Sequence, residues 1–240
     1  MSQPEVRVEA GAILSAAWSL FVWNVVELVA VVAVIYSPYI AYVLVRGAGG
    51  GRFEASLPFL LAVVLSPVAT AAVTWTVLQR QAGRRVGVGD AVRHGLSHLG
   101  TYVGVGVIAG LIVAAGFVLL VVPGVVAACI LAVAAPVAVV EGTDVRDALR
   151  RSAELTSGHR TDIFWTLLVI GLVGGLVQWG LRLVMGAFGL DETRAGDLLT
   201  RVLVQLVFQA LMSTAAVVVY GTLRRLKEGA SLDDLAAGLE

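Results

Sequence analysis

Polar side chains recur at helical spacing inside two apolar stretches near the C-terminus. Arg201, Gln205 and Gln209 follow one another at intervals of four residues, and Gln178 and Arg182 form a similar pair in the preceding apolar stretch. Residues four apart share one face of a helix. Ionisable groups inside a membrane tend to face a bundle interior or a wet cavity. The two sets therefore indicate a pocket for an anion or a lipid headgroup between two helices.

The same polar stripe also has a structural interpretation. Glutamines can hydrogen-bond between membrane helices, and long arginine side chains can extend to the membrane surface. Asp197, four residues before Arg201, is a ready ion-pair partner on the same helix face. The sequence favours this structural interpretation, but the stripe is still its best candidate for a functional site.

A second group of side chains that could do chemistry lies earlier in the chain. Asp90, His94 and His98 are four residues apart, and two histidines at this spacing can bind zinc together with a carboxylate. A solvated helix face is the favoured interpretation, so we expect no metal. Cys129 is the only cysteine, which excludes a disulfide within the chain. The sequence shows no catalytic arrangement of nucleophile and base, and we expect neither a cofactor nor an enzymatic activity.

Charged residues in the middle of the chain can join a surface helix to the membrane bundle. Glu27 and Glu141 lie at the ends of predicted spans, and either carboxylate can reach the arginines that follow Glu141. A latch of Glu141 with Arg150 or Arg151 is favoured over proton or cation binding, because it needs no pathway through the membrane. Arg146, Arg150 and Arg151 also form a basic face that can attract anionic lipid headgroups at about 1 kcal/mol per charge.

Composition places these residues in a membrane protein. The chain has 240 residues, of which 58% are hydrophobic and 14% charged, against roughly 25% charged in soluble domains. Its apolar runs are long enough to cross a hydrocarbon core of about 30 Å. We predict an all-α, polytopic helical bundle that forms a single integral membrane domain over residues 1–230, with a short cytoplasmic tail at 231–240. The six predicted spans are about 25–45, 57–79, 100–122, 124–140, 162–187 and 198–222.

Three amphipathic segments precede the three pairs of spans. Residues 8–21, 88–99 and 144–157 carry apolar side chains at the i, i+3, i+4 and i+7 positions, which is typical of a helix that lies in the membrane interface. This pattern predicts a threefold repeat of surface helix plus hairpin. In the middle hairpin, Pro123-Gly124 forms almost the whole connection. Spans three and four therefore either cross the membrane fully or re-enter as a pair.

The distribution of basic residues predicts the orientation, although the formal net charge is zero. The N-terminus, the 80–99 and 141–161 connections and the C-terminal end carry twelve arginines and lysines, against four in and beside the opposite connections. Basic loops stay in the cytoplasm. We expect both termini on the cytoplasmic side of the cell membrane. The N-terminus lacks the basic region of a secretory signal, and nothing indicates nucleic acid as a partner.

Residues 123–160 and the C-terminal end carry a family resemblance. A Pro-Gly opens a short span that ends in Ala-Pro and then Glu, and an amphipathic helix with a Ser and a Leu-Thr-x-Gly ending follows. These positions are Pro123, Gly124, Ala135, Pro136, Glu141, Ala148, Leu149, Arg151, Ser152, Leu155, Thr156 and Gly158, with Tyr220, Leu223, Arg224, Lys227, Glu228, Gly229 and Leu232 at the end. They resemble the glycerophosphoryl diester phosphodiesterase membrane-domain family. The resemblance implies the membrane fold of a stand-alone relative, without the phosphodiesterase activity of the fused ones.

These observations lead to two expectations for function. The first is a non-enzymatic membrane module that organises or regulates lipids or protein partners. Its expected partners are membrane lipids, a second copy of the chain or another membrane protein. The alternative is a small transporter or channel-like protein whose pathway uses the polar stripe of the last two spans.

Overall fold

The computed structural model describes residues 10–46, 56–84, 86–189 and 194–229. Within these ranges the chain is almost entirely helical and holds no strand, which confirms the all-α prediction. The helices are α1 (Ala10–Ile35), α2 (Ser37–Arg46), α3 (Ser56–Gln81), α4 (Val88–Ser97), α5 (Leu99–Leu119), α6 (Val121–Leu131), α7 (Ala134–Glu141), α8 (Val145–Thr156), α9 (Arg160–Ala187) and α10 (Arg194–Glu228). The predicted tail at 231–240 lies outside the described residues.

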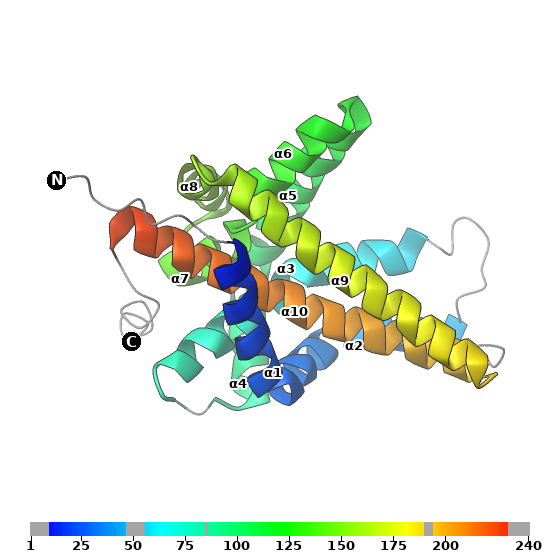
Figure 1. The fold of residues 1–240 in the computed structure, drawn as a ribbon. Helices are drawn as coiled ribbons and strands as arrows, with labels where there is room; N and C mark the ends of the chain where they lie inside the picture. Colours follow the sequence, from blue (N-terminus) through cyan, green and yellow to red (C-terminus); the bar gives the residue numbers. More distant parts are fainter. Residues whose placement is uncertain (1–9, 47–55, 85, 190–193, 230–240) are drawn as a thin grey trace.

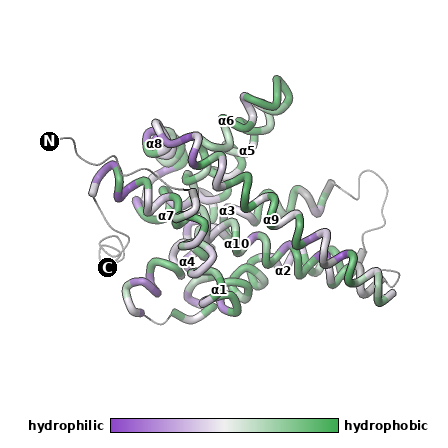
Figure 2. The backbone as a smooth tube through the Cα atoms, viewed as in Figure 1, coloured by the Kyte–Doolittle hydropathy of each residue, from purple (hydrophilic) through white to green (hydrophobic). Residues whose placement is uncertain are grey.

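Six stretches of the described chain are long and apolar enough to cross a membrane. They are Gly11–Ile35, Leu60–Gln81, Leu99–Leu119, Val121–Glu141, Arg160–Ala187 and Leu198–Glu228. Their order and number agree with the predicted spans, so the chain is a multi-pass membrane protein. The first differs in position, because it was predicted at 25–45 and lies at Gly11–Ile35, ahead of the interruption at Tyr36. Figure 2 shows α5 and α6 as hydrophobic throughout, whereas α8 carries hydrophilic residues.

Helices α1, α3 and α10 pack together at the centre of the bundle, and α9 lies alongside α10 (Figure 1). The largest fully buried side chains of this core include Tyr36, Leu78, Tyr220 and Leu223. Helix α9 buries far less of itself than α3 or α10 does. A groove between α9 and its neighbours follows from this loose packing.

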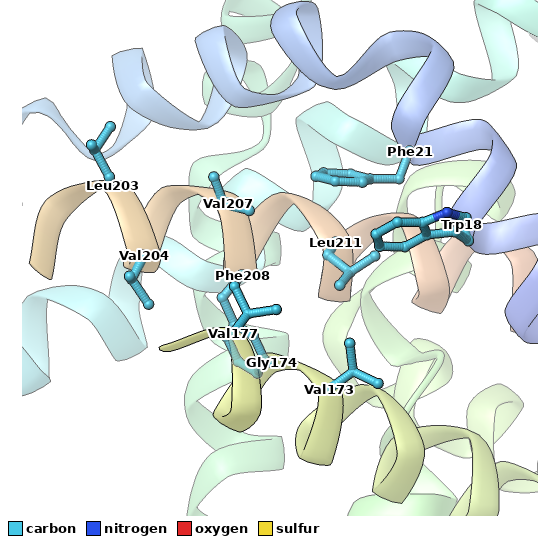
Figure 3. A pocket seen from close by; sticks show the side chains of 10 residues that line it. All are labelled: Trp18, Phe21, Val173, Gly174, Val177, Leu203, Val204, Val207, Phe208 and Leu211. Carbon is cyan, nitrogen blue, oxygen red and sulfur yellow. The ribbon is translucent and has the colours of Figure 1, made fainter. Parts of the chain in front are cut away.

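The structure differs from the prediction at residues 8–21. This segment does not form a separate surface helix, because α1 continues without interruption from Ala10 to Ile35. Residues 12–36 hold no glycine or proline that would end a helix. The helix instead bends after the turns that carry Trp18 and Phe21 (Figures 1 and 3). Two of the three predicted surface helices, at 88–99 and 144–157, form as the separate helices α4 and α8.

The turn of the middle hairpin also lies elsewhere than predicted. Leu120 alone adopts an extended conformation between α5 and α6, with φ −166° and ψ 156°. Pro123 and Gly124 belong to the first turn of α6, where proline is tolerated because its missing N–H would lack a partner in any case. Gly124 serves close packing, since a Cβ there would lie 2.4 Å from the ring of Phe117.

The fourth span is broken between α6 and α7, and α8 covers the break. Ser152 is fully buried and its hydroxyl donates to the carbonyl of Ile130 at 2.7 Å, beside the break. The carboxylate of Asp144 caps the start of α8 by accepting from the N–H of Asp147 at 3.0 Å. A buried carbonyl without a donor is costly, so α8 is part of the membrane fold and is more than a helix resting on its surface.

Pro67 of α3 packs against Gly106 of α5. A Cβ on Gly106 would lie 2.0 Å from Cγ of Pro67, whereas a Cβ on Gly110, one turn later, would meet nothing within 4 Å. We expect Gly106→Ala to lower the stability of the purified protein by about 1–3 kcal/mol, because α3 and α5 must move apart. Gly110→Ala is the matched control, and its unfolding midpoint should equal or exceed that of the wild type. Equal midpoints for wild type and Gly106→Ala would contradict the close contact.

Candidate functional site

The groove between α9 and α10 owes its shape to glycines on α9. A Cβ on Gly174 would lie 2.3 Å from the ring of Phe208, while one on Gly171 or Gly175 would meet nothing within 4 Å. Helix α9 can therefore approach α10 only as far as Phe208 allows. The space beside this contact is left open.

A cavity of about 390 Å³ lies on one side of this contact. Its polar lining consists of Tyr39, Gln178, Arg182, Arg201 and Gln205, which come from α2, α9 and α10. The structure thus brings together four residues of the polar stripe that are distant in sequence. Tyr39 joins them, although nothing in its sequence context marked it.

Two arginines line this cavity, and the described lining holds no carboxylate to balance their charge. The side chains of Gln178, Arg182 and Arg201 are exposed to the cavity or its mouth, and Gln205 is half-buried. The side chain of Asp197, the predicted partner of Arg201, lies outside the described residues. The guanidinium groups and amides together offer donors suited to an anion.

Gln209, the fifth residue of the predicted polar cluster, does not line this cavity. Its side chain is buried, and its Oε1 accepts from the hydroxyls of Tyr36, between α1 and α2, and Ser66 of α3, both at 3.3 Å. Its Nε2 donates to the Ser66 carbonyl at 3.3 Å and to Ser213 Oγ at 3.2 Å. Gln209 therefore holds helices together. The four-residue spacing of Ser66 and Thr70 on α3 was a usable signal for this polar face that our sequence reasoning missed.

The opposite end of α10 carries a charge network that joins α7, α8 and α10. Arg151 Nε donates to Glu141 Oε2 at 3.1 Å, and Tyr220 Oη donates to Glu141 Oε1 at 3.2 Å. Arg224 donates to Tyr220 Oη and to Glu228, both at 2.8 Å. Glu228 also pairs with Arg151. We call these five residues the Glu141 network. The negative charges of its two carboxylates balance the positive charges of its two guanidinium groups, as expected of a structural latch.

The remaining predicted basic residues lie outside this network. Arg150 is exposed and pairs with Asp147 and Glu154 on its own helix, because its position on α8 faces away from Glu141. Arg146 is exposed as well, so only these two arginines of the predicted basic face are open to headgroups. Glu27 pairs with Arg80 of α3 and with neither predicted arginine.

Of the three predicted metal-binding residues, His94 is packed against the bundle, whereas Asp90 and His98 are exposed. His94 stacks on Trp75 with ring centroids 5.1 Å apart, and Tyr102 Oη lies 3.5 Å from its Nε2. His98 Nδ1 lies 2.9 Å from Ser97 Oγ. No group of three or more metal-ligating side chains occurs in the described ranges. Burial, and then the neighbouring His98, lower the pKa of His94.

The Glu141 network generates a prediction for two adjacent arginines. Arg151→Ala removes one of the two arginines that Glu141 and Glu228 share and leaves only Arg224, while the two glutamate side chains are only 17% and 29% exposed. We expect a loss of about 1–3 kcal/mol, less than for a fully buried pair. Arg150→Ala removes only exposed pairs and should cost roughly 0–1 kcal/mol. Thermal unfolding of both variants checks this, and equal losses would contradict the latch.

The stacked His94 generates a pH prediction. A histidine whose pKa is lowered by folding binds its proton more readily when unfolded. It therefore stabilises the fold above the ordinary histidine pKa of about 6.5, and this contribution is lost as the pH falls below that value. We expect His94→Gln to lose less stability than wild type when the pH is lowered from about 7.5 to about 5.5. His159→Gln is the control and should lose as much stability over this pH range as wild type does. If His94→Gln also lost as much stability as wild type, the assignment would be contradicted.

The comparison with protein families gives one result. A family model described as a domain of unknown function, DUF7847, matches residues 85–223, a range that contains α8, both arginines of the cavity and most of α10. No match is found among curated proteins or among solved structures. The result does not bear on the resemblance to the glycerophosphoryl diester phosphodiesterase membrane-domain family, which stays a prediction. Because the matched residues make up more than half of the chain, the protein belongs to the DUF7847 family.

Proposed function

We propose that the protein is a non-enzymatic membrane module that binds an anionic lipid headgroup in the cavity between α9 and α10. The observation that carries the proposal is the gathering of Arg182 and Arg201, from two different helices, on one cavity of about 390 Å³. Arginine matches the geometry of a phosphate oxygen pair.

The depth of the two arginines supports a lipid phosphate as the anion. Helices α9 and α10 have 28 and 35 residues, hence lengths of about 42 and 52 Å, which exceed a hydrocarbon core of about 30 Å. Arg182 lies about 8 Å from the end of α9, and Arg201 about 10 Å from the start of α10. A helix centred in the bilayer places both near the boundary between hydrocarbon and headgroups. The arginine distribution puts this end in the outer leaflet.

Transport of a polar solute is less well supported by the same geometry. A pathway would need polar groups to continue from the cavity toward the Glu141 network. The next residue of the polar stripe, Gln209, instead turns toward Ser66 of α3. The described lining of the cavity also holds no carboxylate, histidine, serine or cysteine, which favours binding over catalysis.

Native mass spectrometry of the purified protein tests the proposal. We expect wild type to retain phosphatidylglycerol in preference to phosphatidylcholine. The double variant Arg182→Gln/Arg201→Gln should bind phosphatidylglycerol roughly 5- to 30-fold more weakly, from about 1 kcal/mol per lost charge.

The control is Arg93→Gln, which removes an exposed arginine of α4 that belongs neither to the cavity nor to the basic face of α8, and it should bind like wild type. An unchanged thermal transition shows that each variant is folded. Equal phosphatidylglycerol retention by the double variant and the wild type would overturn the proposed function.

A further inference from the structure

The hairpin of α5 and α6 lacks the polar residues that mark a loop in water. From Val103 to Val140 the sequence holds no charged residue and no side chain with a nitrogen or oxygen atom. The corresponding stretches between α2 and α3 and between α9 and α10 each carry two charged residues. The turn of the middle hairpin is therefore unlike the other two, and its composition is that of a segment inside hydrocarbon.

The tip of this hairpin lies on the outside of the protein. Its five residues, Val118–Val122, are all valine or leucine and are each between 67% and 86% exposed. Moving apolar side chains from hydrocarbon into water costs about 25 cal/mol per Å² of surface. Because the protein does not cover this tip, the tip is stable only where hydrocarbon surrounds it.

The backbone of the turn is also suited to surroundings without water. The N–H of Leu120 donates to the carbonyl of Gly116 at 3.0 Å, and the carbonyl of Leu120 accepts from the N–H of Gly124 at 3.4 Å. Pro123, in the first turn of α6, brings no N–H that would need a partner. Unpaired backbone groups are costly in hydrocarbon, and a turn of one residue leaves few of them.

Contacts at the base of the hairpin lie far from Gln81, the predicted cytoplasmic end of α3. Gly106 of α5 packs against Pro67, which lies fourteen residues before Gln81, or about 21 Å along the helix. Thirteen residues of α5 follow Gly106, which add about 20 Å. If α5 ran alongside α3, its apolar tip would stand about 40 Å from Gln81, beyond a hydrocarbon core of about 30 Å.

The hairpin avoids this position by leaning away from the bundle. Figure 1 shows α5 and α6 diverging from α9 and α10, so that their tip lies to one side of the bundle and not at the end where α9 finishes. Tyr102 and Val105, the buried large side chains of α5, belong to its first two turns. A hairpin that leans in this way keeps its tip within the hydrocarbon.

We propose that α5 and α6 form a re-entrant hairpin, which enters the membrane from the cytoplasmic side and keeps its tip, residues 118–122, inside the hydrocarbon. The partner of this tip is the acyl-chain region of the surrounding bilayer. The break between α6 and α7 permits this path, because α6 pairs with α5 whereas α7 packs against α3. Two of the six candidate spans thus do not cross the membrane. This topology goes beyond the proposed function and does not rest on it.

Cysteine labelling locates the tip. In the full chain with Cys129→Ala, which removes the only native cysteine, Leu120→Cys puts a single thiol at the turn. Phe188→Cys is the control at the end of α9, where the native side chain is 74% exposed. Right-side-out and inside-out membrane vesicles are treated with a membrane-impermeant maleimide.

We expect labelling of Phe188→Cys in vesicles of one orientation and no labelling of Leu120→Cys in vesicles of either orientation. The reason is that a maleimide reacts with the thiolate, which does not form in apolar surroundings. Leu120→Cys should be labelled once SDS unfolds the protein.

Spin labels on the same two cysteines give a second measurement. In liposomes, the label on Leu120→Cys should collide more often with O₂, which dissolves in hydrocarbon, than with a water-soluble nickel chelate, and the label on Phe188→Cys should show the smaller ratio. An unchanged thermal transition shows that each variant is folded. If Leu120→Cys does not fold, Val118→Cys replaces it, because Val118 is 86% exposed at the same tip.

Two results would contradict the re-entrant hairpin. Labelling of Leu120→Cys from the side that labels Phe188→Cys would show that the hairpin crosses the membrane fully. Labelling from the opposite side would place the tip in water within the bundle. Neither result bears on the arginine-lined cavity between α9 and α10, so the proposed function is tested separately.

Discussion

Hydrocarbon offers no hydrogen bonds, and the whole structure depends on satisfying polar groups within the bundle itself. The broken fourth span shows this most directly. The break between α6 and α7 leaves the Ile130 carbonyl beside it, and the buried hydroxyl of Ser152 on α8 donates to that carbonyl at 2.7 Å. The Glu141 network then fixes α8 to α7 and α10. Helix α8, which the sequence predicts on the membrane surface, is therefore needed by the fourth span, because it supplies the donor for the carbonyl at the break.

The same constraint separates the two halves of the polar stripe on α10. Gln209 is satisfied by Tyr36, Ser66 and Ser213, and has no capacity to spare for a ligand. Gln205 and Arg201, one and two turns away, line a cavity instead. The contact of Gly174 with Phe208 sets how closely α9 approaches α10, and the cavity lies beside this contact.

Much of the fold could be predicted from the sequence, since long apolar runs admit few structures other than membrane helices. Hydropathy predicted the number and order of the spans, and the helical periodicity of apolar side chains predicted α4 and α8. Neither signal predicted the continuous α1 or the turn at Leu120. Helix ends in apolar segments depend on packing, and the sequence does not mark them. Proline is compatible both with the first turn of a helix and with a loop, so Pro123 did not locate the turn.

The candidate site was predictable only in part, for a related reason. A spacing of four residues shows that Arg201, Gln205 and Gln209 share a face of α10, but a helix face is broad enough to meet two different neighbours. Which neighbour each residue meets depends on the angle between α9, α10 and α3. Tyr39 lines the site because α2 lies beside the cavity, and no local sequence pattern indicated this.

The central claim is that an anionic lipid headgroup lies between Arg182 and Arg201 in the cavity beside α9 and α10. An experimental structure of the protein in nanodiscs that contain phosphatidylglycerol tests it most directly. The account predicts density for a headgroup between the two arginines. A cavity filled with water, or an α9 closed onto α10 with no space between them, would contradict it.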